Sequence, residues 1–253
     1  MRILITNDDG IHAPGLKILE NIAKTLTDDI YVVAPATDQS GVAHSLSLND
    51  PLRLRTISDR HYALKGTPTD CVIFAIRHLL KDNPPDLVLS GVNSGTNIAE
   101  DVTYSGTIAG AIEGTLLGVP SIALSQAYGA SGRDHMHWNC AEQHAPGIIR
   151  RLLDNGIPKD VLINLNFPNC APADIAGIAV TEQGRRDAHF LKIDERADGR
   201  GIPYYWIAFT RSLQLPGEGT DLEAMALKKI SITPLRINLT DEPARIQLAS
   251  LFG

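Results

Sequence analysis

Short apolar runs alternate with segments of helical periodicity over the first 166 residues. The apolar runs predict strands at residues 2–6, 30–34, 86–90, 119–125 and 160–166, with a shorter pair at 51–57 and 61–65. The segments between them predict helices at residues 14–28, 69–81, 105–118 and 139–154. Strands that are apolar throughout and separated by helices form a mostly parallel sheet with helices on both faces. The sequence therefore predicts an α/β fold.

This pattern weakens after residue 170. Two apolar arms within residues 187–211, joined by the polar turn ERADGRG, predict a long β-hairpin. A further strand at 228–237 and a terminal helix near 241–251 are expected to follow. At 253 residues the chain is long enough for one large domain, which we expect to consist of a core at 1–170 and an extension at 171–253.

The predicted hairpin is rich in aromatic residues, namely Phe190, Tyr204, Tyr205, Trp206 and Phe209. A two-stranded ribbon is marginally stable by itself, so these rings need a surface to cover them. That surface belongs either to the parent domain or to another subunit. We expect another subunit, because aromatic side chains are enriched at interfaces.

Polar loops follow three of the predicted strands. Asp8 and Asp9 come directly after the first strand, Ser40 follows the second, and Asn93 and Asn97 follow the strand at 86–90. Because ligands of an open parallel sheet bind outside the carboxyl ends of its strands, these side chains are expected to share one edge. Their donor atoms are all oxygen or amide groups, which suits a hard cation such as Mg²⁺ or Mn²⁺.

Adjacent carboxylates at the end of a buried strand require an explanation, because Asp8 and Asp9 repel each other and each is costly to desolvate. A turn exposed to solvent would be one solution. A bound cation would be another, and the two further polar loops favour it.

A second feature points to an anion. Ser105, Gly106 and Thr107 open a predicted helix, and the N-terminus of a helix attracts phosphate. Taken alone, the same residues read as an ordinary N-cap. Beside a cation site they are better interpreted as a phosphate clamp, together with Gly41 of the loop after the second strand.

Other candidates carry less chemistry. Thr67, Thr69 and Asp70 open a helix at the sequence GTPTDC and are interpreted chiefly as caps. A pair of histidines at 135 and 137 lacks the further ligands of a zinc site. His12 is either a proton donor or a polar loop residue. The chain has no GxGxxG after its first strand, no P-loop and no GxSxG nucleophile elbow.

Composition argues against several classes of protein. The formal net charge of −6 and the absence of a basic run weigh against binding to nucleic-acid duplexes. Three widely spaced cysteines without a CxxC motif favour a reducing cytoplasm. The short apolar run at the N-terminus does not resemble a signal peptide, and no apolar stretch is long enough to predict a membrane span.

Five ordered motifs resemble the SurE family of stationary-phase survival proteins: ILITNDDGIHAPG, VVAPATDQSG, GTPTDCV, LVLSGVNSGTN and DVTYSGTIAGAIEG. The resemblance is dense over residues 1–126 and looser afterwards. It implies a Rossmann-like core, a C-terminal hairpin extension and a dimeric or tetrameric assembly. It also implies one divalent metal per subunit at Asp8, Asp9, Ser40 and Asn93, and release of phosphate from nucleoside 5′- and 3′-monophosphates, with short polyphosphate as a substrate of some members.

Together these features predict a metal-dependent phosphomonoesterase. A metal would polarise the phosphoryl oxygens and offset the charge that develops during transfer. Asp8 or Asp9 would also orient or deprotonate the attacking water, and Asn97 with the turn at 105–107 would position the phosphate. The competing hypothesis is a non-catalytic module that binds nucleotides or phosphate at the same edge. A sugar- or dinucleotide-binding enzyme is disfavoured because the glycine fingerprint is missing.

Overall fold

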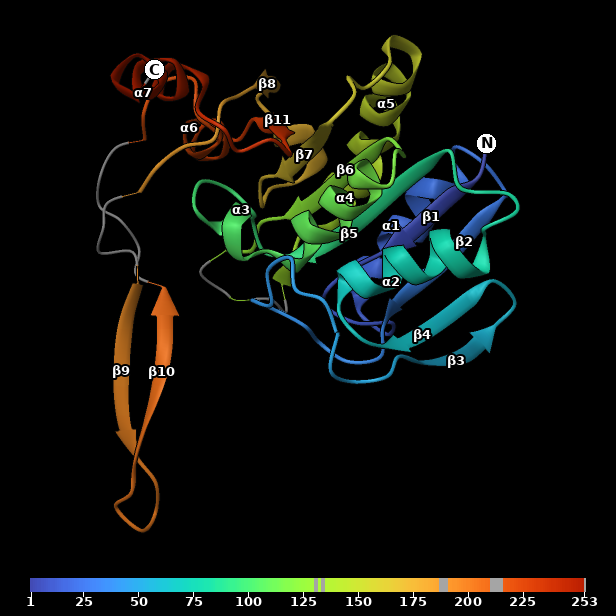
Figure 1. Ribbon diagram of the computed structural model, residues 1–253, viewed down its shortest axis with the longest axis horizontal. Coiled ribbons are helices and arrows are strands. Elements are labelled where there is room, and N and C mark those ends of the chain that lie inside the picture. Colours follow the sequence, from blue (N-terminus) through green and yellow to red (C-terminus); the bar gives the residue numbers. More distant parts are fainter. Residues whose placement is uncertain (130–131, 133–134, 187–190, 210–215, 253) are drawn as a thin grey trace.

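The computed structural model describes residues 1–129, 132, 135–186, 191–209 and 216–252 (Figure 1). The strands are β1 (Ile3–Thr6), β2 (Ile30–Pro35), β3 (Arg53–Ser58), β4 (His61–Lys65), β5 (Leu87–Ser94), β6 (Ser121–Gln126), β7 (Val161–Phe167), β8 (Ile178–Val180), β9 (Leu191–Ala197), β10 (Pro203–Phe209) and β11 (Ile230–Arg236). The α-helices are α1 (Pro14–Lys24), α2 (Pro68–Phe74), α3 (Asp101–Tyr104), α4 (Gly106–Leu116), α5 (Trp138–Asn155), α6 (Asp221–Ala226) and α7 (Glu242–Phe252).

The main sheet has the strand order β3-β4-β2-β1-β5-β6-β7-β11-β8. Neighbouring strands from β4 through to β7 run parallel. β3 is antiparallel to β4, and β11 is antiparallel to β7 and carries β8 alongside it. The predicted mostly parallel sheet is confirmed, and strands of the C-terminal extension continue it at one edge.

Helices cover both faces of this sheet, as predicted. Successive side chains of β1 point to opposite faces, so Ile3 and Ile5 pack in one cluster with α1 and α5, whereas Leu4 packs with α2 on the other side. α4 lies beside α2 and buries Ile108 against the sheet (Figure 1). Both faces of the central strands are therefore excluded from solvent, which explains their unbroken apolar sequences.

Several elements differ from their predicted limits. The helix expected at 69–81 is α2 followed by a π-helical turn at Ala75–Leu79. The helix expected at 14–28 ends at Lys24, where the Thr25 hydroxyl donates to the Ile22 carbonyl. α3, α6 and β8 are short elements that the sequence did not predict, and they depend on contacts with distant parts of the chain.

The predicted hairpin is confirmed as β9 and β10, which pair from Leu191 with Phe209 to Ala197 with Pro203. It extends away from the main sheet (Figure 1), and Tyr205, Trp206 and Ile207 are mostly exposed. Phe190 lies outside the described residues. The ends of the predicted hairpin at 187–190 and 210–211 do so as well.

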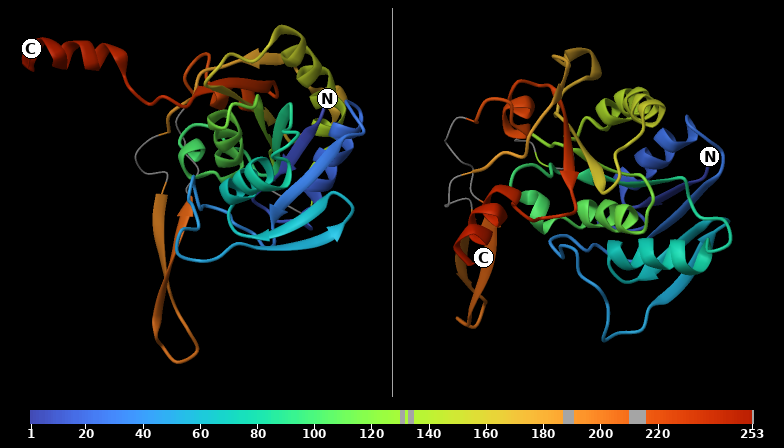
Figure 2. Two further views of the ribbon diagram at one scale, coloured as in Figure 1. Left: turned by 45° about the vertical axis from the view of Figure 1, so that its right-hand side comes forward. Right: turned by 45° about the horizontal axis from the view of Figure 1, so that its top comes forward.

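The predicted terminal helix is confirmed as α7, which projects from the body of the molecule (Figure 2). All of its residues are exposed, including Ile246, Leu251 and Phe252. Along the described part of the chain no helix, α7 included, is long and apolar enough to cross a membrane.

Candidate metal and phosphate site

Three loops meet at the carboxyl edge of β1, β2 and β5. The Gln39 N–H from the loop after β2 donates to the Asp8 carbonyl at 2.8 Å. The Ser94 N–H at the end of β5 donates to Asp9 Oδ2 at 3.1 Å. The loops that carry Asp8 and Asp9, Ser40, and Asn93 and Asn97 are therefore neighbours, which is the convergence that the sequence predicted.

Asp8 is the most buried carboxylate of this edge, with only 4% of its surface exposed. Burial and, to a smaller extent, the neighbouring charge of Asp9 raise the pKa of Asp8 to about 6, against hydrogen bonds from Thr107 that lower it. The Thr107 hydroxyl donates to Asp8 Oδ1 at 2.6 Å. A buried carboxylate held in this way would favour the binding of a cation, because a bound cation would stabilise its ionised form.

The N-terminus of α4 lies against Asp8. A Cβ atom added to Gly106 would come within 2.8 Å of Asp8 Cβ, so only glycine allows this approach. Ser105 is the N-cap, and its hydroxyl accepts the Ile108 N–H at 3.1 Å. Both side-chain hydroxyls of the turn are thus hydrogen-bonded within the protein, that of Ser105 to α4 and that of Thr107 to Asp8. The positive end of the helix dipole is directed to the same edge.

Asn93 and Ser40 are oriented by neighbouring groups. The Asn93 Nδ2 donates to the Gly95 carbonyl at 3.0 Å, so its amide oxygen is the atom that would ligate a cation. Ser40 is exposed, and both its N–H and its hydroxyl donate to Asp38 Oδ1 at 2.7 Å. The hydroxyl oxygen keeps its lone pairs for a cation. Gly41, the next residue, is also exposed.

Asn97 lies in a buried amide network. Its Nδ2 donates to the Ser125 hydroxyl at 2.8 Å, and its backbone N–H donates to Asn166 Oδ1 at 2.9 Å. The Asn97 carbonyl accepts from Asn164 Nδ2 at 2.7 Å. The side-chain NH₂ is therefore directed to β6, and the asparagines of β7 fix where the loop leaves the sheet.

Asp38, Asn164 and Asn166 were not among the residues predicted for the site. Asp38 sits two residues before Ser40 and orients it, but an acidic residue in a polar loop gives no distinctive signal. The alternation INLN within an otherwise apolar strand was a usable signal for the other two, because a buried amide requires partners.

Two of the weaker candidates form a helix cap. Thr67 and Asp70 form a capping box at α2, with the Thr67 N–H 2.8 Å from Asp70 Oδ2. His12, His135 and His137 are exposed. Among the described residues, no group of three or more histidine, cysteine or acidic side chains could hold a metal ion.

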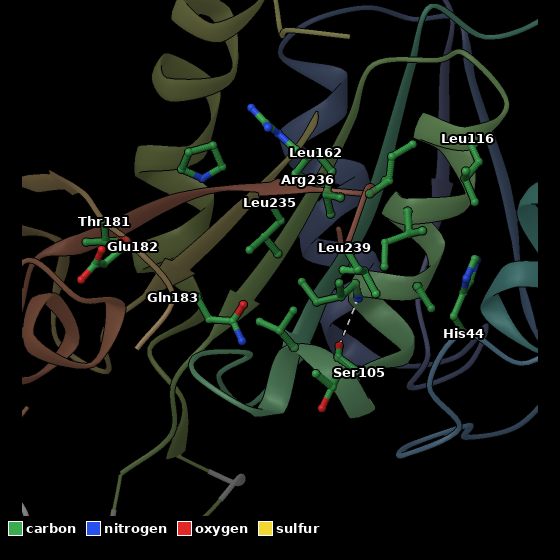
Figure 3. Close-up of a pocket in the computed structure, with 17 residues that line it drawn as sticks. His44, Ser105, Leu116, Leu162, Thr181, Glu182, Gln183, Leu235, Arg236 and Leu239 are labelled. Atoms are coloured by element: carbon green, nitrogen blue, oxygen red, sulfur yellow. Dashed lines mark hydrogen bonds between the residues drawn. The ribbon is translucent and has the colours of Figure 1, made fainter. Parts of the chain in front are cut away.

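A groove of about 670 Å³ opens beside α4, with Thr181 at one side and His44 at the other (Figure 3). Its walls are mainly apolar side chains such as Ile112, Leu116 and Leu235. Such apolar walls do not suit a phosphate group.

Comparisons with known proteins agree with this fold. The model of the family described as "Survival protein SurE" matches residues 3–190. A relative from Beijerinckia indica, named 5′-nucleotidase SurE, is 67% identical over 98% of this chain and 95% of its own. One of the same name from Methylocella silvestris is 62% identical over 98% of both chains. The crystal structure of the SurE protein from Aquifex aeolicus has a TM-score of 0.86 and 40% identity, with 100% of both chains covered. The chain belongs to the SurE family.

Proposed function

We propose that this protein is a divalent-metal-dependent 5′-nucleotidase, a phosphoric monoester hydrolase that acts on nucleoside 5′- and 3′-monophosphates and also on short polyphosphate. One observation carries the proposal. Asp8, a buried carboxylate, lies beside Asp9 at the junction of three loops and against the N-terminus of α4. This arrangement provides a place for a cation and, next to it, a place for an anion.

The residues present fit one Mg²⁺ or Mn²⁺ ion per subunit. Asp8, Asp9, Ser40 and Asn93 would hold it, because they offer carboxylate, hydroxyl and amide oxygens without histidine or cysteine. Burial raises the pKa of Asp8 to about 6 and so disfavours its charged form, a cost that a bound cation would offset. When bound, such an ion polarises phosphoryl oxygens and lowers the pKa of water.

The remaining roles belong to side chains and backbone around the cation. Asp9, which is only partly buried, is suited to orient the attacking water and hold its proton. The first N–H groups of α4, at Ser105 to Thr107, together with Gly41 and Asn97, would surround the phosphate. Thr107 has a second role, since its hydroxyl keeps Asp8 in place.

The relatives support the reaction class, because high-identity proteins that align over almost the whole chain are named 5′-nucleotidase SurE. The test is phosphate release from adenosine 5′- and 3′-monophosphate and from tripolyphosphate, with Mn²⁺, with Mg²⁺ and with EDTA. Release that requires a cation supports the proposal. Nucleotide binding without release under any of these conditions would overturn it in favour of a non-catalytic binding module.

The proposal extends to assembly and location. We expect a homodimer or homotetramer, because the hairpin and α7 expose large apolar side chains such as Ile207 and Phe252. The three free, buried cysteines are consistent with a cytoplasmic location. With a net charge of −6, duplex nucleic acid is not expected to be a partner.

A further inference from the structure

The loop between Asn97 and α3 contains a strained residue. Ala99 has a backbone φ of 51°, in the left-handed region, although it carries a Cβ atom. It is completely buried. A residue persists in this conformation only where its surroundings hold it firmly. The loop connects Asn97 to α3 and Ser105, so its shape sets where the phosphate side of the site lies.

Both polar backbone groups of Ala99 are held by the C-terminal extension. The Ala99 N–H donates to Asp221 Oδ2 at 2.9 Å, across 122 residues of sequence. The Ala99 carbonyl accepts from Gln183 Nε2 at 2.9 Å. Neither partner is a member of the proposed metal or phosphate set, and neither is close to Ala99 in the chain.

Asp221 is fully buried and accepts three backbone N–H groups. Besides Ala99, its other carboxylate oxygen accepts from Gly184 at 2.9 Å and from Leu222 at 2.8 Å. A Cβ atom added to Gly184 would lie 2.8 Å from that oxygen, so glycine is needed for the approach. The carboxylate thus ties the segment at 183–186 and the start of α6 to the loop.

Arg186 holds the next part of the loop. Its guanidinium donates to both oxygens of Asp101, at 3.0 and 2.8 Å, in a two-point contact. Its backbone N–H donates to Glu100 Oε1 at 2.8 Å. The Arg186 and Asp101 side chains are 17% and 18% exposed, so solvent screens this ion pair less than one on the open surface.

We propose that Asp221, Gln183 and Arg186 are positioning residues that clamp the loop at 97–101 and thereby set the affinity of the site for phosphate. This proposal rests on the proposed function, because it takes the edge beside Asn97 and Ser105 as the place where phosphate binds. The contacts of the clamp given above go to the loop at 97–101, to the segment at 183–186 and to the start of α6. The clamp therefore acts on the anion side and leaves cation affinity largely unchanged.

The test uses Asp221→Asn and Arg186→Gln in the full chain. The first replaces one acceptor oxygen by a donor of the same size, so the side chain can no longer accept from Ala99, Gly184 and Leu222 together. The second removes the two-point contact with Asp101. Arg60→Gln is the matched control, since Arg60 pairs with Asp29 at 3.0 Å on the opposite edge of the sheet. Arg186→Lys is the conservative variant and is expected to recover part of the loss.

Four measurements distinguish the clamp from a general contribution to stability. We expect the KM for a nucleoside 5′-monophosphate and the Kd of inorganic phosphate to rise at least about tenfold, since a displacement of about 1 Å can cost on the order of a hundredfold. The Kd of Mn²⁺ should stay within about twofold. Backbone amides at 96–104 should exchange hydrogen faster in both variants than in the Arg60→Gln control.

The proposal is overturned if both clamp variants melt at lower temperature while KM and the phosphate Kd stay at the wild-type values. It is also overturned if exchange at 96–104 does not change. A wild-type protein that releases no phosphate would contradict the proposed function instead. In that case phosphate titration and hydrogen exchange still decide whether the clamp holds.

Discussion

Replacing Asp8 by Asn should abolish activity and stabilise the metal-free protein at the same time. The substitution keeps the shape of the side chain and its acceptor for the Thr107 hydroxyl, but it removes the charge. Charged ligands dominate the affinity of a hard cation, so we expect phosphate release to fall at least about a hundredfold at saturating Mn²⁺.

The gain in stability follows from the pKa of Asp8, which burial raises from 3.8 to about 6. A carboxyl whose pKa is higher in the folded state binds its proton more tightly there, and this raises the free energy of unfolding. The contribution is fully present below pH 3.8 and is lost as the pH rises through about 6. A shift of about two pKa units corresponds to about 3 kcal/mol, an upper value for what ionised Asp8 costs the metal-free protein above pH 7.

Thermal unfolding in EDTA between pH 4 and pH 8 measures this cost. The wild-type protein should lose stability across the interval from pH 4 to pH 7, and Asp8→Asn should lose less. Added Mn²⁺ should raise the melting temperature of the wild type only. Asp82→Asn, at an exposed position, serves as control. Near-normal turnover in Asp8→Asn, or identical pH dependence of both proteins in EDTA, would refute the reasoning.

Three other changes test neighbouring features. Ser105→Ala removes the N-cap of α4 and should lower the free energy of unfolding by about 1 kcal/mol in urea titrations, with Mn²⁺ affinity unchanged; unaltered stability would contradict the capping role. Thr107→Val removes a hydrogen bond to ionised Asp8 and should weaken Mn²⁺ binding about tenfold at pH 7, as measured by calorimetry. An unchanged Mn²⁺ affinity would show that this hydrogen bond is unimportant for the cation. Replacement of residues 187–211 by a short glycine–serine linker should shift the mass from light scattering toward smaller assemblies, and an unchanged mass would exclude the hairpin as a subunit contact.

Much of the fold was predictable because its signal is local. The central strands are buried on both faces, so their apolar runs stand out in the sequence. β8 was not predictable, since it has three residues of which Ile178 and Val180 are exposed. The short helices α3 and α6 were missed for a similar reason. A helix of four or six residues is stable only through contacts that the sequence does not display.

The site was predictable only in part. Topology brings the loops after β1, β2 and β5 to one edge, so grouping Asp8, Asp9 and Asn93 needed no knowledge of side-chain contacts. The assignment of Thr107 to Asp8 and the inward direction of the Asn97 amide required the structure. Asp221 and Arg186 lie more than 80 residues from the loop at 97–101 that they hold, and no periodicity connects positions at that separation.

The point at which the hairpin leaves the main body is closed by backbone hydrogen bonds. The Glu182 N–H donates to the Gly219 carbonyl at 3.1 Å, and the Asp221 N–H donates to the Glu182 carbonyl at 3.0 Å. The segment between these residues therefore begins and ends at one place. Its first residues, at 183–186, hold the loop at 97–101, and the hairpin of β9 and β10 follows them. Lengthening or exchanging this hairpin adds only a loop-closure cost that grows slowly with length. The hairpin can therefore diverge, or be replaced by a foreign binding module, while residues 183–186 and the sheet edge that holds Asp8 stay as they are.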